Sequence, residues 1–469
     1  MSQYSSGPAE KDLKHDYEND QPALNNTPSI AGEAQVHDDV FGDITDEGPN
    51  YRAVGWIGTV ALMMKTQVGL GVLSIPAVFD VLGILPGIIC LIVIAAITTW
   101  SDYMIGVFKR NHPQIYGIDD AGFLIFGRVG REIFVWIFVA GSGMLGISIG
   151  LNAVSLHGTC TAVFVAVAAI CGFLLASVRT LGRISMLAWV GLVCIMTAIF
   201  TVTIAVGVQD RPAAAPQEGH WKSDWKVVGN PSFTEAISSI SSLIFAYAGT
   251  PGFFAIAAEM KRPEHYTRSL LICQTGVTIT YIVIGCVVYL YCGSYVASPA
   301  LGSAGHLIKR VAYGISLPGL LATTVLVIHF AAKYVFVRLL RGTKHLSSNS
   351  AIHWGTWLAC TIITTVIAYL IASGIPVFGG LVSLVGALLG TLMSFQLYGF
   401  MWLYDNWAKG KRDPNMKWYL MVAFSVFVIV SGTFLMIGGT YGSIVGIIDS
   451  YKASGGSAAF SCADNSNST

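Results

Sequence analysis

The chain alternates long apolar stretches with short polar segments along most of its length. A membrane-spanning helix needs about 20 predominantly apolar residues. Eleven stretches are long enough, at about 54–79, 82–108, 132–156, 159–178, 185–208, 233–259, 269–293, 316–340, 352–374, 376–403 and 417–440. The composition agrees, because only 11% of the residues are charged, against about 25% in soluble proteins. The pattern therefore predicts an all-α integral membrane protein with eleven spans.

Two of these spans contain glycine and proline where a membrane helix should be continuous. The first span contains Gly69-Leu70-Gly71 followed by Pro76, and the sixth contains the run 246–252, AYAGTPG. Lipid offers no hydrogen bonds to freed backbone groups, so such breaks are tolerated only where they are buried in protein or line a cavity. Each break therefore indicates a functional position rather than a lipid-facing one.

The two breaks occupy matching positions in two blocks of five spans, residues 54–208 and 233–403. An odd number of spans per block makes the second block insert with the opposite orientation, which is the arrangement of an inverted repeat. Half-helix N-termini suit a carboxylate, and exposed carbonyl groups suit an ammonium group or a cation. Because a zwitterionic amino acid needs both, the pattern predicts an amino acid transporter.

Basic residues orient the spans, since cytoplasmic loops are enriched in lysine and arginine. With the N-terminus inside, 20 of the 27 basic residues are cytoplasmic, 6 are outside, and Lys65 lies within the first span. The C-terminus is then extracellular. The predicted organisation is a cytoplasmic tail, the first repeat, an extracellular loop, the second repeat, a cytoplasmic loop with span 11, and an extracellular tail, at 1–50, 51–208, 209–232, 233–403, 404–440 and 441–469.

The two predicted tails and the cysteines add smaller expectations. Residues 1–50 hold 11 of the 26 acidic residues and few apolar ones, which predicts a disordered segment. Asn467 begins an extracellular Asn-Ser-Thr glycosylation acceptor. The nine cysteines show no metal-binding spacing, so no metal site is expected. Cys160, Cys292 and Cys462 lie near the predicted outer face, where one disulfide is possible.

Several motifs resemble those of the amino acid/auxin permease family. The run 65–76, KTQVGLGVLSIP, is similar to the family's first helix, and the run 245–251, FAYAGTP, followed by Ala258-Glu259-Met260 and Pro263, is similar to its sixth. Ile375-Pro376 with Gly386-Ala387 resembles a late motif. The resemblance covers about residues 38–440 and is strongest to fungal neutral amino acid permeases of the methyltryptophan-resistance type.

This resemblance implies a LeuT-like fold of five plus five spans with an eleventh helix. It also implies secondary active uptake of neutral amino acids, aromatic and aliphatic ones included, by alternating access and usually coupled to protons. The substrate carboxylate is expected at the first break and its ammonium group at the carbonyls of the second, with selectivity from spans 3, 6, 8 and 10. The expected substrate-binding residues are Gly69, Leu70, Gly71, Ser74, Gly143, Ile147, Phe245, Ala246, Tyr247, Ala248 and Gly249.

Ionisable residues within spans are costly to insert, so each is a candidate for coupling or gating. Lys65 precedes the first break, where sodium-coupled relatives of the fold hold a sodium ion together with span 8. Its ammonium group either replaces that ion or extends to the cytoplasmic headgroups. His329 in span 8 either changes charge near neutral pH or stays neutral and hydrogen-bonded. Lys333 and Arg338 are expected to reach the inner headgroups or face lipid.

Two acidic residues complete the coupling and gating candidates. Glu259 ends span 6 and is either an inner-gate partner for a cytoplasmic arginine or lysine, or a plain interfacial carboxylate. Asp102 in span 2 either pairs with a lysine or carries protons, or is partly exposed near the inner interface.

Other classes of function fit the sequence less well. None of the catalytic motifs expected of an enzyme is present, and neither are the repeated pore loops of a channel. A sodium-coupled symporter and an amino acid sensor built on a transporter fold remain alternatives. The expected partners are a neutral amino acid and the lipid bilayer, without nucleic acid or cofactor, and the coupling ion is expected to be a proton. The plasma membrane is the expected location, with a vacuolar membrane as the alternative.

Overall fold

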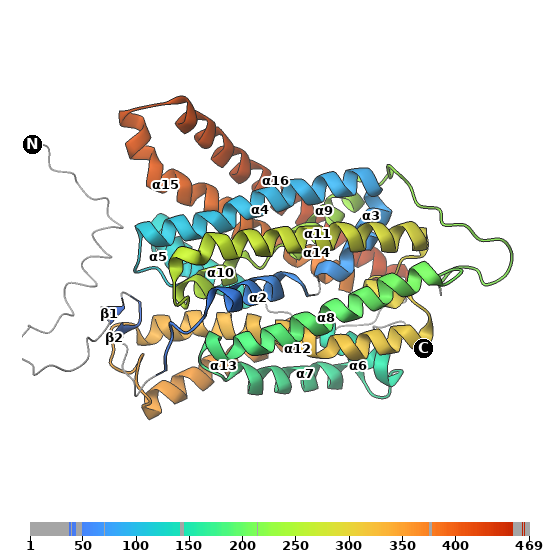
Figure 1. Ribbon diagram of the computed structural model, residues 1–469, viewed down its shortest axis with the longest axis horizontal. Helices are drawn as coiled ribbons and strands as arrows, with labels where there is room; N and C mark the ends of the chain where they lie inside the picture. Colours follow the sequence, from blue (N-terminus) through green and yellow to red (C-terminus); the bar gives the residue numbers. More distant parts are fainter. Residues whose placement is uncertain are drawn as a thin grey trace, which may run out of the picture.

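The computed structural model of the chain describes residues 37–38, 40–43, 49–69, 71–140, 145–212, 214–374, 378–453, 462 and 464. Long helices run nearly side by side along one axis of the molecule (Figure 1). Predicted features that fall outside the described residues are Leu70, Gly143, Asn467 and the Ile375-Pro376 motif. Most of the acidic segment 1–50 also falls outside them.

The first five predicted spans correspond to seven helices and one short 3₁₀ turn. Span 1 is divided into α2 (Trp56–Gln67), the turn η1 (Gly71–Ser74) and α3 (Ile75–Leu82). The described parts of span 3 are the C-terminal end of α5 (Ile118–Ala140) and α6 (Leu145–Ser155). Spans 2, 4 and 5 are α4 (Ile84–Asn111), α7 (Thr161–Ala176) and α8 (Leu181–Val208).

The second block repeats the division of its first span. Span 6 consists of α9 (Phe233–Ala246) and α10 (Thr250–Ala258), with a break at 247–249. Spans 7, 8 and 9 are α11 (Tyr266–Cys292), α12 (His306–Leu340) and α13 (Ala351–Gly374), and short 3₁₀ turns flank α11 at η2 (Pro263–His265), η3 (Gly293–Tyr295) and η4 (Ala300–Ser303).

Span 10 is not a regular α-helix. It starts as α14 (Phe378–Val385), passes through two π-helical segments, η5 (Gly386–Gly390) and η6 (Leu392–Gln396), and ends as α15 (Leu397–Arg412). The last helix is α16 (Met416–Ala453). π-helical turns inside α-helices occur frequently at functional sites.

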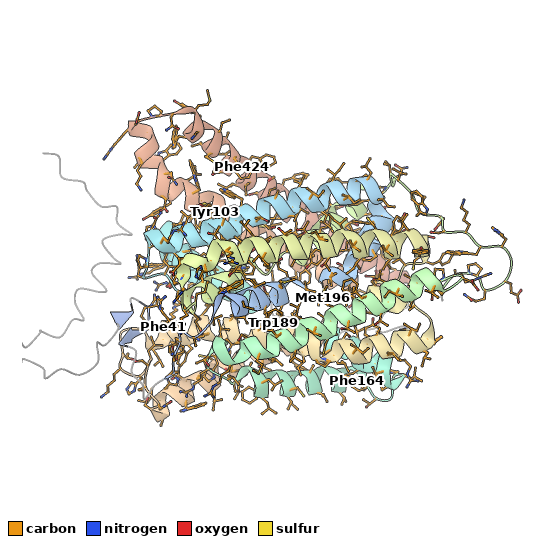
Figure 2. All side chains as sticks on the ribbon, in the orientation of Figure 1. Phe41, Tyr103, Phe164, Trp189, Met196 and Phe424 are labelled. Carbon is orange, nitrogen blue, oxygen red and sulfur yellow. A yellow bond between two sulfur atoms is a disulfide. The ribbon has the colours of Figure 1, made fainter. Side chains whose placement is uncertain are left out.

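Within the described residues, nine helical stretches are long and apolar enough to cross a membrane, and two shorter apolar helices lie at Gly146–Ser155 and Thr161–Ala176. The shorter two fall in predicted spans 3 and 4, so the count of eleven stays a prediction. Side chains stand outward over much of the bundle (Figure 2). Many of the exposed ones are large and apolar, among them Ile170, Ile204 and Phe427. Such a surface is suited to a lipid environment, because apolar side chains are stable in contact with lipid tails and are unfavourable in water.

The packing of the helices follows the predicted repeat. In the first block α2 packs against α8, and in the second α9 packs against α14 and η5, so that the first and fifth spans pair in both blocks. Corresponding spans also meet across the blocks: α4 packs against α11, and α7 packs against α13. The contacts therefore relate the two blocks as equivalent units.

The two ends of the bundle differ. One end, called here the hairpin end, carries the short antiparallel strands β1 (His37–Asp38) and β2 (Gly42–Asp43), and Phe41 between them is only 2% exposed (Figures 1 and 2). The predicted topology makes this end cytoplasmic. At these residues the structure differs from the disorder predicted up to residue 50, because Phe41 stacks on Tyr51, with ring centroids 4.4 Å apart.

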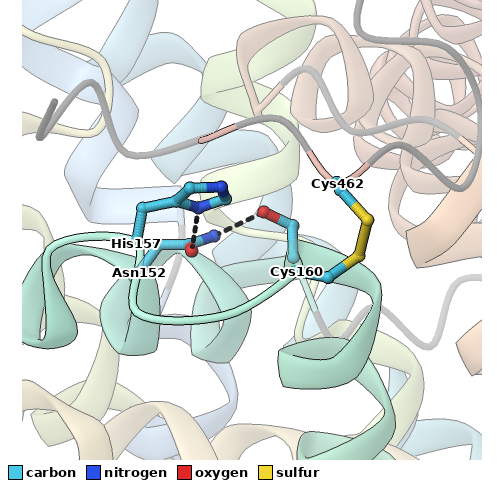
Figure 3. The surroundings of a disulfide bond; sticks show 5 residues. Asn152, His157, Cys160 and Cys462 are labelled. Atoms are coloured by element: carbon cyan, nitrogen blue, oxygen red, sulfur yellow. Dashed lines mark hydrogen bonds between the residues drawn. A yellow bond between two sulfur atoms is a disulfide. The ribbon is translucent and has the colours of Figure 1, made fainter.

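The opposite end carries the loop between α8 and α9 (Figure 1). Cys160, just before α7, is bonded to Cys462, 302 residues further along the chain (Figure 3). Cys292, the third candidate of the sequence, is buried with a free thiol. The sequence allowed one disulfide among these three cysteines, and the structure shows it between Cys160 and Cys462.

Candidate functional site

A cavity lies where the two helix breaks meet. Its volume is about 120 Å³, roughly ten times the space that one water molecule needs. Five helical spans contribute to its wall: 1, 6, 8, 9 and 10. The lining residues are Thr66, Gln67, Gly69, Gly71, Phe245, Ala248, Gly249, Pro251, Gly252, Thr323, Val327, Phe330, Ile371, Phe378, Leu381, Val382, Val385, Leu389, Gly390 and Met393.

The glycines of the breaks allow the two broken helices to approach closely. A Cβ atom at Gly71 would lie 2.4 Å from the Cα of Ala246, which is closer than real Cβ atoms come to backbone. A Cβ atom at Gly249 would lie 2.8 Å from the hydroxyl of Thr66. Each break thus packs against the other through a residue without a side chain, and this contact explains why glycine occupies both positions.

The predicted substrate-binding residues divide into two groups. Gly69, Gly71, Phe245, Ala248 and Gly249 line the cavity. The other described ones do not line it, namely Ser74, Ile147, Ala246 and Tyr247.

Tyr247 illustrates why some predicted residues lie outside the wall. Its phenol points to α11, where its oxygen lies 3.0 Å from the hydroxyl of Thr278. Ser74 donates its hydroxyl proton to the carbonyl of Gly71 at 2.8 Å, which closes the turn after the first break.

Lys65 lies directly beside the cavity and is completely buried. Its ammonium group donates to the carbonyl oxygen of Val68 at 2.8 Å and to the hydroxyl of Thr323 on α12. Among the described residues, no carboxylate forms an ion pair with it. The side chain therefore joins the first break to span 8, and the alternative that it extends to the headgroups does not match this position.

Glu259 and Lys333 form a buried ion pair near the hairpin end. The lysine donates to the Glu259 carboxylate and, at 3.0 Å, to the carbonyl of Arg179, while the backbone N–H of Leu181 donates to the second carboxylate oxygen at 3.1 Å. Both side chains are buried. Lys333 therefore neither faces lipid nor reaches the headgroups, and the expectation from the sequence was wrong. The expectation failed because α8, α10 and α12 enclose the position together.

An aromatic cluster covers this ion pair at the hairpin end. The ammonium group of Lys333 lies 4.4 Å from the ring centroid of Tyr51 and 6.0 Å from that of Phe41. The ring of Phe41 also meets Tyr116 edge-on, with centroids 5.6 Å apart. The segment before α2 is held to the end of α10 by Val54, whose N–H donates to the carbonyl of Glu259 at 3.1 Å. The hairpin end is thereby closed over the ion pair.

Asp102 and His329 are buried at two other places. Asp102 on α4 accepts a hydrogen bond from Gln274 on α11, and its other carboxylate oxygen has no partner among the described residues. Asp102 is completely buried, and no lysine among the described residues forms an ion pair with it. His329 lies against Trp357 of α13, with ring centroids 5.2 Å apart. The four coupling candidates therefore do not form one cluster.

Three polar side chains at the cavity were missed by the sequence analysis: Thr66, Gln67 and Thr323. Thr66 and Gln67 lie inside the first-helix motif. The neighbouring glycines indicated that backbone groups bind the substrate, so these two side chains were not among the predicted binding residues. Thr323 is one of many hydroxyl residues in apolar spans, and its sequence carries no signal that separates it from the others. Among the described lining residues, no side chain carries a formal charge.

The fold and this site define a membrane transporter with two broken helices around a central cavity. The fold resembles that of a Na⁺-coupled sialic acid symporter solved in a substrate-bound, outward-open state, with a TM-score of 0.50, 13% identity, and coverage of 84% of this chain and 92% of that one. This likeness and the paired breaks confirm the predicted LeuT-like fold class.

The chain belongs to the transmembrane amino acid transporter family, whose pattern matches residues 52–445. It is 33% identical to a transmembrane transporter of Gibberella moniliformis, with 94% of this chain and 97% of that protein covered. It is 30% identical to the N amino acid transport system protein of Neurospora crassa, with 90% and 92% covered. The protein is therefore a multi-pass membrane transporter of an amino acid transporter family rather than an enzyme, as the resemblance implied.

Proposed function

We propose that the protein is a proton-coupled symporter that imports neutral amino acids, aromatic and aliphatic ones included, by alternating access at the plasma membrane. The observation that carries this proposal is the cavity between the two breaks. It offers unwound backbone for the charged α-groups of an amino acid and an otherwise apolar wall for its side chain. An uncharged wall disfavours acidic and basic substrates, whose side chains would be buried without a partner.

The apolar part of the wall comes mainly from spans 8 and 10. Val327 and Phe330 contribute from α12, and Leu381, Val385 and Met393 contribute from span 10. Such side chains favour a substrate by the apolar area that it buries, about 25 cal/mol per Å². Large apolar side chains should therefore bind more tightly than small ones. The carboxylate is assigned to the backbone at Gly69–Gly71, and the ammonium group to the carbonyls near Phe245–Ala248.

Lys65 supports proton coupling in this proposal. Its ammonium group stands between the first break and span 8 and holds Val68 and Thr323 together. A change in its protonation alters the contact between α2 and α12 beside the substrate. Asp102 is a second candidate proton acceptor, because it is a buried carboxyl group next to Gln274 and close to the second break. Glu259 is proposed as a gate residue through its pair with Lys333, and His329 as a neutral packing residue.

A sodium-coupled symporter and an amino acid sensor are the two alternatives. The structural neighbour is described as Na⁺-coupled, which favours a sodium-coupled symporter. A sensor would keep the binding cavity without accumulating the ligand.

Uptake of labelled amino acids into vesicles separates these alternatives. The expected result is accumulation that follows an imposed pH gradient and does not require sodium. Uptake that tracks sodium and ignores the pH gradient would overturn proton coupling. Binding without any accumulation would indicate a sensor.

A further inference from the structure

The polar side chains at the cavity differ in whether their hydrogen-bonding groups are already in use. Thr66 donates its hydroxyl proton to the carbonyl of Met63 at 2.8 Å. Thr323 accepts from Lys65 and donates to the carbonyl of Gly319 at 3.2 Å. The amide of Gln67 is different: neither its Nε2 nor its Oε1 has a partner among the described residues.

An unpaired amide is costly at this position. Gln67 is only 3% exposed, and a buried donor or acceptor without a partner costs about 1–3 kcal/mol. Buried polar groups in native proteins are nearly always satisfied, by protein, water or ligand. Gln67 is among the residues that line the cavity, and its buried amide has both its donor and its acceptor unused, so a molecule in the cavity is a candidate partner for that amide.

The backbone at Gln67 is held in place by a residue of the seventh span. The hydroxyl oxygen of Tyr281 lies 2.8 Å from the carbonyl oxygen of Gln67 and 2.8 Å from that of Ala246. Its single proton is shared between the two, so one phenol ties the first break to the second. The stem of Gln67 also packs against the second break, since a Cβ atom at Gly249 would lie 3.0 Å from its Cγ.

We propose that the Gln67 side chain binds the charged α-groups of the substrate and that Tyr281 positions it. In this arrangement Nε2–H donates to the α-carboxylate, and Oε1 accepts from the α-ammonium group. An amide is an uncharged side chain that carries two N–H donors and a carbonyl acceptor on separate atoms. It serves a zwitterion without adding a net charge to the cavity. This inference rests on the proposed function and adds a side-chain contact to the backbone contacts assigned at that site.

The direct test compares Gln67→Met with Gln209→Met in an uptake assay. Methionine keeps the length and the unbranched shape of glutamine but has neither amide group. We expect Gln67→Met to raise the half-saturation concentration of a neutral amino acid about tenfold or more, because hydrogen bonds to charged groups are the strong ones. Gln209→Met is the matched control, because it makes the same exchange at the end of α8, where the Gln209 amide donates to the carbonyl of Ser303 and does not line the cavity; it should change the half-saturation concentration less than twofold.

A second ligand separates binding of the α-groups from a general distortion of the cavity. The amine analogue of the same amino acid lacks the carboxylate, so Gln67→Met should weaken it less than it weakens the amino acid. Gln67→Glu keeps an acceptor but has no N–H donor, so it should shift the preference toward the amine. Equal losses for both ligands, or a Gln67→Met protein that behaves like the wild type, would overturn the assignment.

The positioning role of Tyr281 has its own variant. Tyr281→Phe removes only the hydroxyl group and should raise the half-saturation concentration with little change in the maximal rate. Tyr289→Phe on the same helix is the control, because its hydroxyl accepts from the N–H of Lys226 in the loop, away from the cavity. Equal effects of the two variants would remove Tyr281 from this role.

Failure of the inference can be told apart from failure of the proposed function. A wild-type protein that takes up no neutral amino acid contradicts the proposed function itself. Wild-type uptake together with an unaffected Gln67→Met variant contradicts only the role of Gln67. Purified variants are compared with the wild type by thermal unfolding, and if Gln67→Met does not fold, Gln67→Glu with the two ligands decides the question.

Discussion

The ammonium group of Lys65 donates a hydrogen bond to the carbonyl oxygen of Val68, 2.8 Å away, at the point where α2 ends. A carbonyl at a helix break is one of the groups that otherwise bind a cation or remain unsatisfied. The lysine thus supplies a positive charge from within the chain at the place where the sequence analysis considered a sodium ion.

If this charge couples transport to protons, Lys65→Met should abolish accumulation driven by a pH gradient. Exchange of labelled for unlabelled amino acid across the vesicle membrane should continue, because the cavity remains. Accumulation is measured with an imposed gradient, and exchange is measured without one. Lys222→Met in the exposed loop is the control for loss of a lysine. Full pH-dependent accumulation by Lys65→Met would exclude the residue from coupling.

The first part of this site could be predicted from local sequence. Gly69, Gly71 and Pro251 disturb a membrane helix wherever it packs, so the two breaks and the inverted repeat could be inferred from residue types, whereas the LeuT-like fold class followed from the family resemblance. The partner of Lys65 could not, because Thr323 lies 258 residues away. Only packing of α2 against α12 brings the two together.

Other parts of the site depend on packing in the same way. The π-helical turns at Gly386–Gly390 lie where Gly386 meets the backbone of Ser241, and the local sequence does not predict this contact. Lys333 was expected near lipid or the headgroups, because the sequence of a single span does not show which face of the helix packs against other helices. Gln67 was overlooked because its importance comes from an amide without a partner, a property that only the three-dimensional arrangement defines.

The buried ion pair of Glu259 and Lys333 should be sensitive to loss of one partner. Glu259→Gln leaves an unpaired ammonium group in the interior, which typically costs about 3–5 kcal/mol. We expect a clear fall in the unfolding temperature of the purified protein in detergent. The double variant Glu259→Gln with Lys333→Met should recover part of this loss, because no buried charge then remains.

The same helix supplies a control for this ion pair. Arg338 and Glu132 form an ion pair whose side chains are 35% and 45% exposed. Exposed pairs contribute about 0–1 kcal/mol, so Arg338→Gln should hardly change the unfolding temperature. If Arg338→Gln were as destabilising as Glu259→Gln, or the double variant were worse than both single ones, the assignment of a buried gate pair would be wrong.

Asp119, in the segment before predicted span 3, gives the stability a pH dependence. Burial, together with the neighbouring charge of Asp120, raises the pKa of Asp119 to about 7. Between about pH 4 and pH 7 the folded protein keeps a proton at this carboxyl group, which the unfolded chain has released. Stability therefore falls as the pH rises through this window and levels off above it. Asp119→Asn should flatten the dependence, measured as unfolding temperature against pH.

The neighbouring carboxylate is the control for this prediction. Asp120 accepts two hydrogen bonds from the guanidinium group of Arg341, both at 3.0 Å. Asp120→Asn removes the charge of that ion pair, so it should lower stability throughout the pH range above about pH 5. Because burial is the larger cause of the raised Asp119 pKa, this variant should flatten the profile only in part. A profile that is unchanged in Asp119→Asn would show that Asp119 titrates normally.

The disulfide between Cys160 and Cys462 tests the predicted orientation, because disulfides persist on the oxidising side of the membrane. A protease site inserted after Gln217 in the exposed loop divides the chain between the two cysteines. After cleavage, the fragments should migrate together on a denaturing gel without reductant and separate with it. Cys462→Ser should separate them under both conditions, whereas Cys292→Ser, which removes a buried free thiol, should not. Separation of the unmodified fragments without reductant would contradict the disulfide and the extracellular placement of the C-terminal tail.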